Sequence, residues 1–275
     1  AVIKWLRALQ IKQVVRDDGP ATHSTKAGTP TMGGLLLLGA ALIPTLLWAD
    51  LTNEYVWLAV LSTVSFGAIG FVDDYLKIAR DTPQGLSARM KLFAQSVVAL
   101  AVGLALIELA QNNLYNTDLI FPFFKEFTPD IGWLYVPFAM LVLVMASNAV
   151  NLTDGLDGLA ISVFTVAAGA FTALTYVSGH AVIAEFLLIV RFPPAGELTI
   201  FCGSLVGAGL GFLWYNSYPA DVFMGDVGSL ALGGALGTVA LLIKQELLLP
   251  IVGAVFLIEM ISVVVQVGSF KMTGQ

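Results

Sequence analysis

Long apolar runs separated by short polar stretches make up most of the chain from residue 32 onward. Each run holds about 20 residues, roughly the number that a helix needs to cross the hydrocarbon core of a bilayer. The runs are continuously apolar and do not alternate with polar positions, which favours helices over the strands of a barrel. We therefore predict an all-α, polytopic integral membrane helical bundle. Its eight predicted spans are 32–49, 55–72, 92–110, 131–147, 158–177, 198–215, 227–243 and 248–268.

Residues 1–16 differ from these runs, because Lys4, Arg7, Lys12 and Arg16 interrupt the apolar positions. Such a mixture is typical of a helix that lies at a membrane surface or in the cytoplasm. We interpret the segment in this way, or as the tail of a further span.

Composition agrees with lipid as the main solvent. The chain is 57% hydrophobic and only 12% charged, with a mean hydropathy of +0.86, whereas soluble domains carry roughly a quarter charged residues. The formal net charge of −6 does not by itself indicate an acidic surface, because the carboxylates gather in a few clusters between apolar runs. The single cysteine, Cys202, lies inside an apolar run. We expect it to pack in the core, with no disulfide framework and no cysteine-based metal site.

Lysine and arginine residues divide unevenly between the two sets of connecting segments, ten on one side and three on the other. Cytoplasmic loops carry the excess of these residues, so the richer side is predicted to be cytoplasmic. The polar motifs described below all fall on that side too, which predicts a single active site there. The richer side holds Lys4, Arg7, Lys12, Arg16, Lys26, Lys77, Arg80, Arg89, Lys91 and Lys271, and the other holds Lys125, Arg191 and Lys244.

The first motif is the acidic pair Asp73-Asp74, which closes the second predicted span. Adjacent carboxylates at a membrane surface repel each other unless a cation lies between them. They could therefore bind a metal ion. Helical spacing also places Lys77 beside both, so a salt-bridged helix end is the alternative.

The second motif, residues 148–158, joins the fourth and fifth predicted spans. Its Asn151, Asp154 and Asp157 are three residues apart and share one face if the segment is helical. The set resembles the oxygen ligands of a hard cation, although the spacing is not that of an EF-hand. A helix cap with a turn could explain Asp154 alone, but not the whole set.

The third motif, residues 216–229, joins the sixth and seventh predicted spans. Asp226 opens a helix, where the helix dipole favours an anion or where the carboxylate could simply cap free backbone donors. Phe223 could stack on a base or sugar, or could fold under the loop.

The fourth motif precedes the first predicted span. Lys26 and Thr31 flank a glycine-containing stretch that could hold a phosphate, although Walker spacing is absent. His23 in the same stretch is better explained as a surface histidine. Farther along, Glu259 lies within the last predicted span and is expected to hydrogen-bond another helix, while Gln266 could reach the site.

These charges together indicate a reaction type. Carboxylates and basic residues beside the lipid headgroups suit metal-assisted phosphoryl transfer, in which the metal neutralises a diphosphate and a carboxylate deprotonates or positions the acceptor. Since a soluble kinase needs no spans, we expect the acceptor to be a lipid phosphate.

Four segments in this order also resemble a known family: residues 23–34, 71–75, 148–158 and 222–229. The chain is similar to the phospho-N-acetylmuramoyl-pentapeptide transferases, within the polyprenyl-phosphate N-acetylhexosamine-1-phosphate transferase superfamily. The resemblance implies a Mg2+-dependent enzyme of the bacterial inner membrane, facing the cytoplasm. It would transfer phospho-sugar from UDP-N-acetylmuramoyl-pentapeptide to undecaprenyl phosphate, giving lipid I and UMP for peptidoglycan, and hence for cell shape and division. Membrane lipid is an expected partner and a homodimer is allowed, whereas nucleic acid is not expected.

Carried over by position, the resemblance makes Asp73, Asp74 and Asp226 the essential aspartates. It implies that Asp226 is the magnesium ligand, that Asp73 is the base on the lipid phosphate, and that Asp74 serves the metal or the diphosphate. The uridine would be held by Lys26, Leu152, Asp157, Asn216 and Phe223, with Phe223 stacking on uracil. The same cleft would be lined by Thr31, Asn151, Asp154 and Gln266.

The family has ten spans and a histidine-rich loop beyond the point where this chain stops. We therefore expect residues 1–275 to be a single transferase domain that lacks one helix at each end. Three alternatives stay open: a sister transferase that uses a UDP-N-acetylglucosamine-type donor, a secondary transporter, and a non-catalytic scaffold. Transporters usually place acidic residues at the middle of the membrane, whereas most of those here lie at one side.

Overall fold

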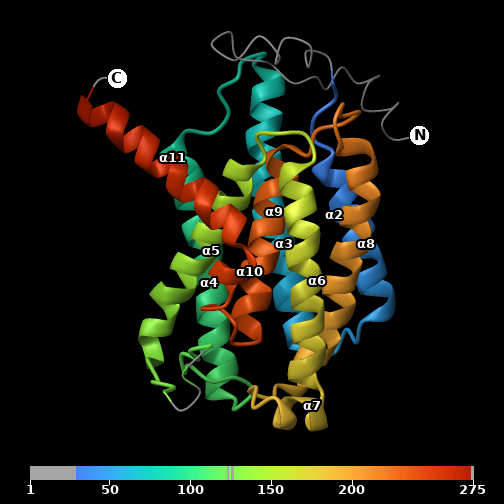
Figure 1. Ribbon diagram of the computed structural model, residues 1–275, viewed down its shortest axis with the longest axis vertical. Coiled ribbons are helices and arrows are strands. Elements are labelled where there is room, and N and C mark those ends of the chain that lie inside the picture. Colours follow the sequence, from blue (N-terminus) through green and yellow to red (C-terminus); the bar gives the residue numbers. More distant parts are fainter. Residues whose placement is uncertain (1–28, 123, 125–126, 274–275) are drawn as a thin grey trace.

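Helices form most of the computed structural model, which describes residues 29–122, 124 and 127–273 (Figure 1). Over these residues the backbone forms no β-sheet, as predicted. The α-helices are α2 (Gly34–Trp48), α3 (Glu54–Ala79), α4 (Ala88–Gln111), α5 (Tyr135–Thr153), α6 (Leu159–Gly179), α7 (Ala181–Phe186), α8 (Leu198–Asn216), α9 (Gly225–Leu242), α10 (Leu249–Val252) and α11 (Ala254–Thr273). Short 3-10 turns, η2 (Gly132–Leu134) and η3 (Pro193–Glu197), lead into α5 and α8.

Seven of the predicted spans correspond to helices that are long and apolar enough to cross a membrane. These confirm a polytopic, all-α membrane protein. The first predicted span, 32–49, forms the shorter α2 of 15 residues. Its start is delayed because the backbone before it bonds elsewhere: Gly33 N donates to Phe223 O at 2.9 Å, and Gly34 N to Met224 O at 2.8 Å.

The last predicted span, 248–268, is wrong as one continuous helix. The chain forms the single turn α10, breaks at Gly253, and restarts as α11, which continues to Thr273. An apolar pattern carries no signal for this break, because both parts are equally hydrophobic. α11 lies across the outside of the bundle against α5, and only 6% of its most apolar window is buried within the protein (Figure 1).

The centre of the bundle is α9, whose residues from Val227 to Leu242 are all buried. It packs mainly against α3 and α5. Small residues permit the close approach, as is usual between helices in membranes. At Gly70 of α3, a Cβ atom would lie only 2.1 Å from the carbonyl oxygen of Asp226, so no side chain fits between the two helices there.

The second predicted span, 55–72, continues in the structure to Ala79. Asn53 caps its start by accepting a hydrogen bond from Tyr55 N at 2.9 Å. The extension keeps Asp73, Asp74 and Lys77 in the last turns of α3, where helical geometry fixes their directions. A connection of residues 80–87 then leads to α4, whose first turn is capped by the Ser87 hydroxyl.

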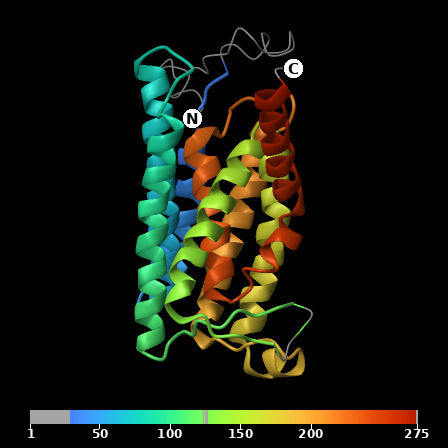
Figure 2. The ribbon, with the colours of Figure 1, turned by 90° about the vertical axis from the view of Figure 1, so that its left-hand side faces the viewer.

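The ends of the helices bring the polar motifs together. α3, α5 and α8 end, and α4, α6 and α9 begin, at the upper end of the bundle in Figures 1 and 2. We call this the carboxylate end. The motifs predicted to share one side of the membrane therefore lie at one end of the structure.

At the opposite end, Lys244 lies in the connecting segment after α9, where the sequence placed it. Its side chain is fully buried just after α9, with Nζ 3.6 Å from Glu246 Oε1 and 3.9 Å from the centroid of the Tyr135 ring. Tyr115 completes the cluster, since its hydroxyl lies 2.7 Å from that of Tyr135.

Candidate active site

Three aspartates form the centre of the carboxylate end. Asp73 and Asp74 come from the last turns of α3, and Asp226 from the first turn of α9. One carboxylate oxygen from each lies within 4.8 Å of the other two. Residues 150 positions apart in the sequence thus form one acidic cluster, as the sequence predicted.

The backbone of α9 fixes the position of this cluster. Val227 N donates a hydrogen bond to Asp74 Oδ2 at 3.1 Å, which joins the end of α3 to the start of α9. Gly225 adopts φ = +74°, a left-handed conformation that a side chain would strain. A Cβ atom there would also lie 2.5 Å from Asp74 Oδ2. Glycine at 225 therefore lets the loop before α9 pass directly over the carboxylates.

Two lysines balance the acidic charge. Lys77 Nζ lies 2.6 Å from Asp73 Oδ2, 3.4 Å from Asp74 Oδ1 and 3.1 Å from Asp226 Oδ2. Lys91, from the first turn of α4, places its Nζ 2.6 Å from Asp226 Oδ2 and 3.4 Å from Asp73 Oδ2. The salt-bridged helix end considered for Lys77 is therefore present, as part of a larger cluster.

The two oxygens of Asp73 have different surroundings. Oδ1 accepts a hydrogen bond from Leu86 N at 2.8 Å. Oδ2 is buried and has no hydrogen-bond partner among the described residues, although the ammonium group of Lys77 is in ion-pair contact with it. A buried oxygen of this kind, among three carboxylates, has the hard-oxygen chemistry that a divalent cation such as Mg2+ requires. The residues present therefore fit such an ion.

The second motif borders the same cluster. Asn151 lies in the last turn of α5, and its Oδ1 accepts a hydrogen bond from Ser229 Oγ of α9 at 2.8 Å. Asp154 follows the helix end. Burial, and then the charges of Asp226, Asp74 and Asp157, hold the pKa of Asp154 well above its usual range. Asp154 therefore lies within electrostatic reach of the aspartate cluster.

Only part of this motif is helical. The helix ends at Thr153, so Asp157 is reached through a turn and does not share a helical face with Asn151. Its Oδ2 accepts a hydrogen bond from Ala220 N at 3.2 Å, across the facing loop. The side chain of Leu152 is exposed.

The third motif is held in place by Asn216, whose side chain is buried at the end of α8. Its Nδ2 donates to Val222 O at 2.9 Å, and its Oδ1 accepts from Gly158 N at 3.1 Å. Both polar atoms of the amide thus connect the loops on either side. Phe223 is half-buried, and its backbone N–H donates to Pro30 O at 2.9 Å.

Of the fourth motif, Thr31 is described, whereas Lys26 and His23 lie outside the described residues. Thr31 is half-buried beside the loop that opens α9. Its Oγ1 lies 3.1 Å from the position that a Cβ atom on Gly225 would take. The segment before α2 therefore borders the aspartate cluster, as the sequence suggested.

Gln266 is not brought to the cluster by any described contact. Its side chain is exposed on α11, and its Nε2 donates to Ser262 Oγ at 3.0 Å on the same helix. Glu259, one turn before Ser262, is half-buried. Among the described residues it makes no hydrogen bond to another helix, so the structure does not support the helix-to-helix bond expected for it.

Sequence analysis did not identify two groups that contact the aspartate cluster, the Lys91 side chain and the Leu86 backbone N–H. Lys91 was counted only as a basic residue between spans, although its place just before an apolar run on the side of the aspartates was a usable signal. The backbone N–H of Leu86 gave no signal at all, because its role depends on how residues 80–87 fold back over α3.

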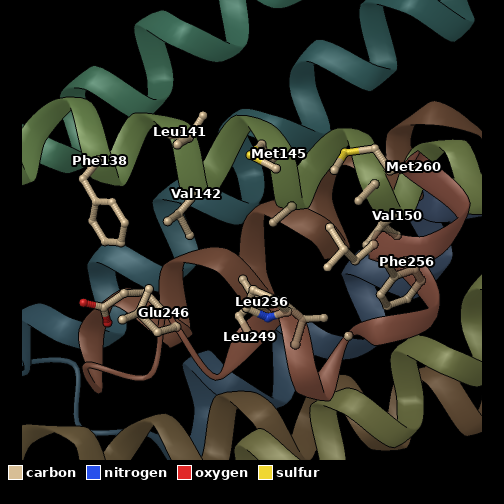
Figure 3. A pocket seen from close by; sticks show the side chains of 16 residues that line it. Phe138, Leu141, Val142, Met145, Val150, Leu236, Glu246, Leu249, Phe256 and Met260 are labelled. Atoms are coloured by element: carbon tan, nitrogen blue, oxygen red, sulfur yellow. The ribbon is translucent and has the colours of Figure 1, made fainter. Parts of the chain in front are cut away.

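A separate apolar pocket of about 180 Å³ lies between α5, the end of α9 and the start of α11 (Figure 3). Phe138 and the carboxylate of Glu246 lie at one end of the pocket, and Val150 and Met260 lie at the other. Val150 lies in the last turn of α5, the helix that also carries Asn151, so one end of the pocket lies at the carboxylate end of that helix.

The arrangement can bind a divalent cation through carboxylates, and it includes two ammonium groups of the kind that bind phosphate oxygens. Comparisons with known proteins support the same kind of chemistry. Residues 56–244 match the model of glycosyl transferase family 4. Residues 26–38 match signature 1 of the phospho-N-acetylmuramoyl-pentapeptide transferases.

Curated relatives with that enzyme name are similar over nearly the whole chain. One from Koribacter versatilis is 56% identical over 99% of this chain and 76% of its own length. Those from Pelobacter propionicus and Citrifermentans bemidjiense are 55% and 56% identical, each over 100% of this chain and 76% of its own length.

Proposed function

Because this chain belongs to the phospho-N-acetylmuramoyl-pentapeptide transferases, a group of membrane enzymes in glycosyl transferase family 4, we propose that it acts on a UDP-linked donor and undecaprenyl phosphate. The products are lipid I, for peptidoglycan synthesis, and UMP. The single observation that carries the proposal is the convergence of Asp73, Asp74 and Asp226. Membership of an enzyme family sets aside the transporter and scaffold alternatives.

In the proposed reaction, an oxygen of the lipid phosphate attacks the phosphorus that carries the sugar. A new P–O bond forms, the P–O bond to UMP breaks, and the electron pair leaves on UMP. Asp73 takes or orients any proton on the attacking phosphate. Its Oδ2 suits this role, because it faces Lys77 and Lys91 in the centre of the cluster while Oδ1 is held by Leu86 N. We favour this direct attack over a covalent aspartyl intermediate.

Magnesium, when bound, would neutralise the diphosphate and polarise the bond that breaks. Asp226 would hold it, and Asp74 would serve the metal or the diphosphate. Lys77 and Lys91 would then turn from the carboxylates to the phosphate oxygens, because a cation among the carboxylates replaces them as counter-charge. Their present contacts to Asp226 Oδ2, at 3.1 and 2.6 Å, support that exchange.

The nucleoside is proposed to lie over the loops held together by Asn216. Phe223 would stack on uracil, and Asp157, Leu152 and Lys26 would hold the uridine. Because both amide atoms of Asn216 bond the backbone of neighbouring loops, its contribution would be to shape the pocket as much as to touch the ligand. Thr31, Asn151, Asp154 and Gln266 are proposed to line the same cleft.

We place the carboxylate end at the cytoplasmic face of the bacterial inner membrane. The described basic residues Lys77, Arg80, Arg89, Lys91 and Lys271 support this orientation, since all lie in or beside that end. The apolar pocket beside α5 supports an acceptor with a hydrocarbon chain, because its apolar lining includes Val150, one residue before Asn151 in α5.

The test is release of UMP in detergent with magnesium, undecaprenyl phosphate and either of two donors. The proposal expects turnover with UDP-N-acetylmuramoyl-pentapeptide and none with UDP-N-acetylglucosamine; the reverse would indicate the sister transferase. Asp226→Asn should abolish release and weaken Mn²⁺ binding, measured by electron paramagnetic resonance. Asp221→Asn, an exposed aspartate in the same loop, is the matched control. Near-normal turnover in Asp226→Asn would refute the metal assignment.

A further inference from the structure

Short helix α7 lies at the end of the bundle opposite the carboxylates (Figures 1 and 2). It exposes large apolar side chains. Val182 is 70% exposed and Phe186 is 83% exposed. They are four residues apart and so share one face of the helix. Ala184, on another face, is fully buried against the bundle. The apolar face of α7 thus has no partner among the described residues.

The length of the preceding helix sets the depth of this face. α6 has 21 residues, which at about 1.5 Å per residue match a hydrocarbon core roughly 30 Å thick. α7 begins two residues after α6 ends and therefore starts at the boundary between acyl chains and headgroups. Tyr176, in the last turn of α6, is exposed and packs on the His180 ring at 5.8 Å. Aromatic residues favour this boundary.

Exposed apolar side chains on α6 are followed by others on α7. Val166 and Tyr176 are exposed along α6, and Val182 and Phe186 follow on α7. Because α6 spans the membrane, its exposed apolar side chains face lipid. The same lipid is therefore available to the apolar face of α7.

The end of α7 adds an independent observation. Leu188 adopts φ = +53°, the left-handed conformation that usually falls to glycine after a helix. Leu188 N donates to Glu185 O at 3.1 Å and Ile189 N to Ala184 O at 2.9 Å, which closes the helix end. Yet the Leu188 side chain is 71% exposed. Glycine would suit this backbone conformation better. An apolar environment such as lipid would explain why the position carries a leucine side chain.

We propose that α7 lies on the membrane as an interfacial anchor, with Val182, Phe186 and Leu188 inserted into the leaflet opposite the carboxylate end. Arg191, exposed three residues after Leu188, is placed to reach lipid phosphates, as basic side chains do at this depth. The anchor fixes the connection between α6 and α8 at the membrane surface, and it acts independently of the proposed reaction.

Site-directed spin labelling tests this directly, because the chain has a single, buried cysteine. In a Cys202→Ala background, Val182→Cys and Phe186→Cys are labelled with a nitroxide. The protein is placed in vesicles of phosphatidylethanolamine and phosphatidylglycerol, and collisions with oxygen, which concentrates in lipid, are compared with those of a water-soluble nickel chelate. We expect oxygen to dominate at both positions, as it should at Val166→Cys in the span.

Ala181→Cys is the matched control, since Ala181 is exposed on the same helix but about 100° around it from Val182. There the nickel chelate should dominate. Nickel dominance at Phe186→Cys and Val182→Cys would overturn the proposal and place α7 in water. Spin–spin broadening that disappears when labelled protein is diluted with unlabelled protein would also overturn it, in favour of a second copy covering α7.

Discussion

At the scale of single residues, Asp73 depends on one backbone group. The hydrogen bond from Leu86 N holds Oδ1 and leaves Oδ2 directed at the lysines and Asp226. Gly85 makes this possible, because a Cβ atom there would lie 2.6 Å from Asp73 Oδ1 and 2.8 Å from the Asp73 carbonyl oxygen. The position of the proposed base therefore depends on a residue that has no side chain.

Gly85→Ala should consequently lower kcat for UMP release. Losing a hydrogen bond to a charged group costs about 1.5–3 kcal/mol, which corresponds to a fall of roughly 10- to 100-fold if the bond is retained in the transition state. The change lies in an exposed connection, so the melting temperature should move little. Gly39→Ala is the control, because a Cβ atom at Gly39 of α2 meets open space. An unchanged kcat in Gly85→Ala would show that the bond does not position Asp73.

At the scale of elements, the site depends on how closely α3 approaches α9. Asp74 reaches Val227 N, and Lys77 reaches Asp226, only because Gly70 lies directly against the Asp226 carbonyl oxygen. The interface that packs the bundle is thus also the interface that assembles the carboxylates. Stability and activity should therefore change together when this contact is altered.

Gly70→Ala should reduce both the stability of the protein and its activity. Overpacking of a close-packed interior typically costs about 1–3 kcal/mol, and here it would push Asp226 away from Asp73 and Asp74. We expect a lower melting temperature in detergent together with loss of UMP release. Gly169→Ala on α6, where a Cβ atom meets open space, should be neutral or slightly stabilising, because alanine is the better helix former. If Gly70→Ala matched this control, the proposed coupling of packing and catalysis would be wrong.

At the scale of the whole molecule, both ends of the bundle hold lysines paired with carboxylates, but in different surroundings. At the carboxylate end, Lys77 and Lys91 pair with the aspartates of the candidate site. A bound ligand is proposed to replace these pairs. At the opposite end, Lys244 and Glu246 are buried with Tyr115 and Tyr135 and connect the end of α9 to α5 and to the loop before it. Burial lowers the pKa of Lys244 to about 8 and raises that of Glu246.

This cluster predicts a pH dependence of stability. Lys244 has its usual pKa of 10.5 when unfolded and about 8 when folded, so between these values the unfolded chain binds more protons. Its contribution to the free energy of unfolding should therefore rise with pH across this window, by about 3 kcal/mol at 1.36 kcal/mol per pH unit. The melting temperature in detergent, measured from pH 7.5 to 10.5, should show this rise, and Lys244→Met should remove it. A melting curve for Lys244→Met with the same pH dependence as the parent would contradict the assignment.

The sequence by itself determined the architecture and the side on which the chemistry lies. Backbone groups cannot remain unpaired in lipid, so runs of about 20 apolar residues must be helices. Once the spans are counted, every connecting segment is assigned to one side or the other. That logic alone placed Asp73, Asp74, Asn151 and Asp226 on one side, and a recognisable order of motifs identified the enzyme family.

Tertiary structure alone decided which atoms meet. The approach of α3 to α9 at Gly70, the approach of Lys91 to Asp226, and the fold of residues 80–87 over Asp73 are contacts between segments far apart in the chain or across a turn. Hydropathy describes the solvent that each residue prefers, and that is a property of the residue itself. It contains no information on neighbours, so it missed the break at Gly253 and gave no sign that Lys244, in the connection after α9, is buried.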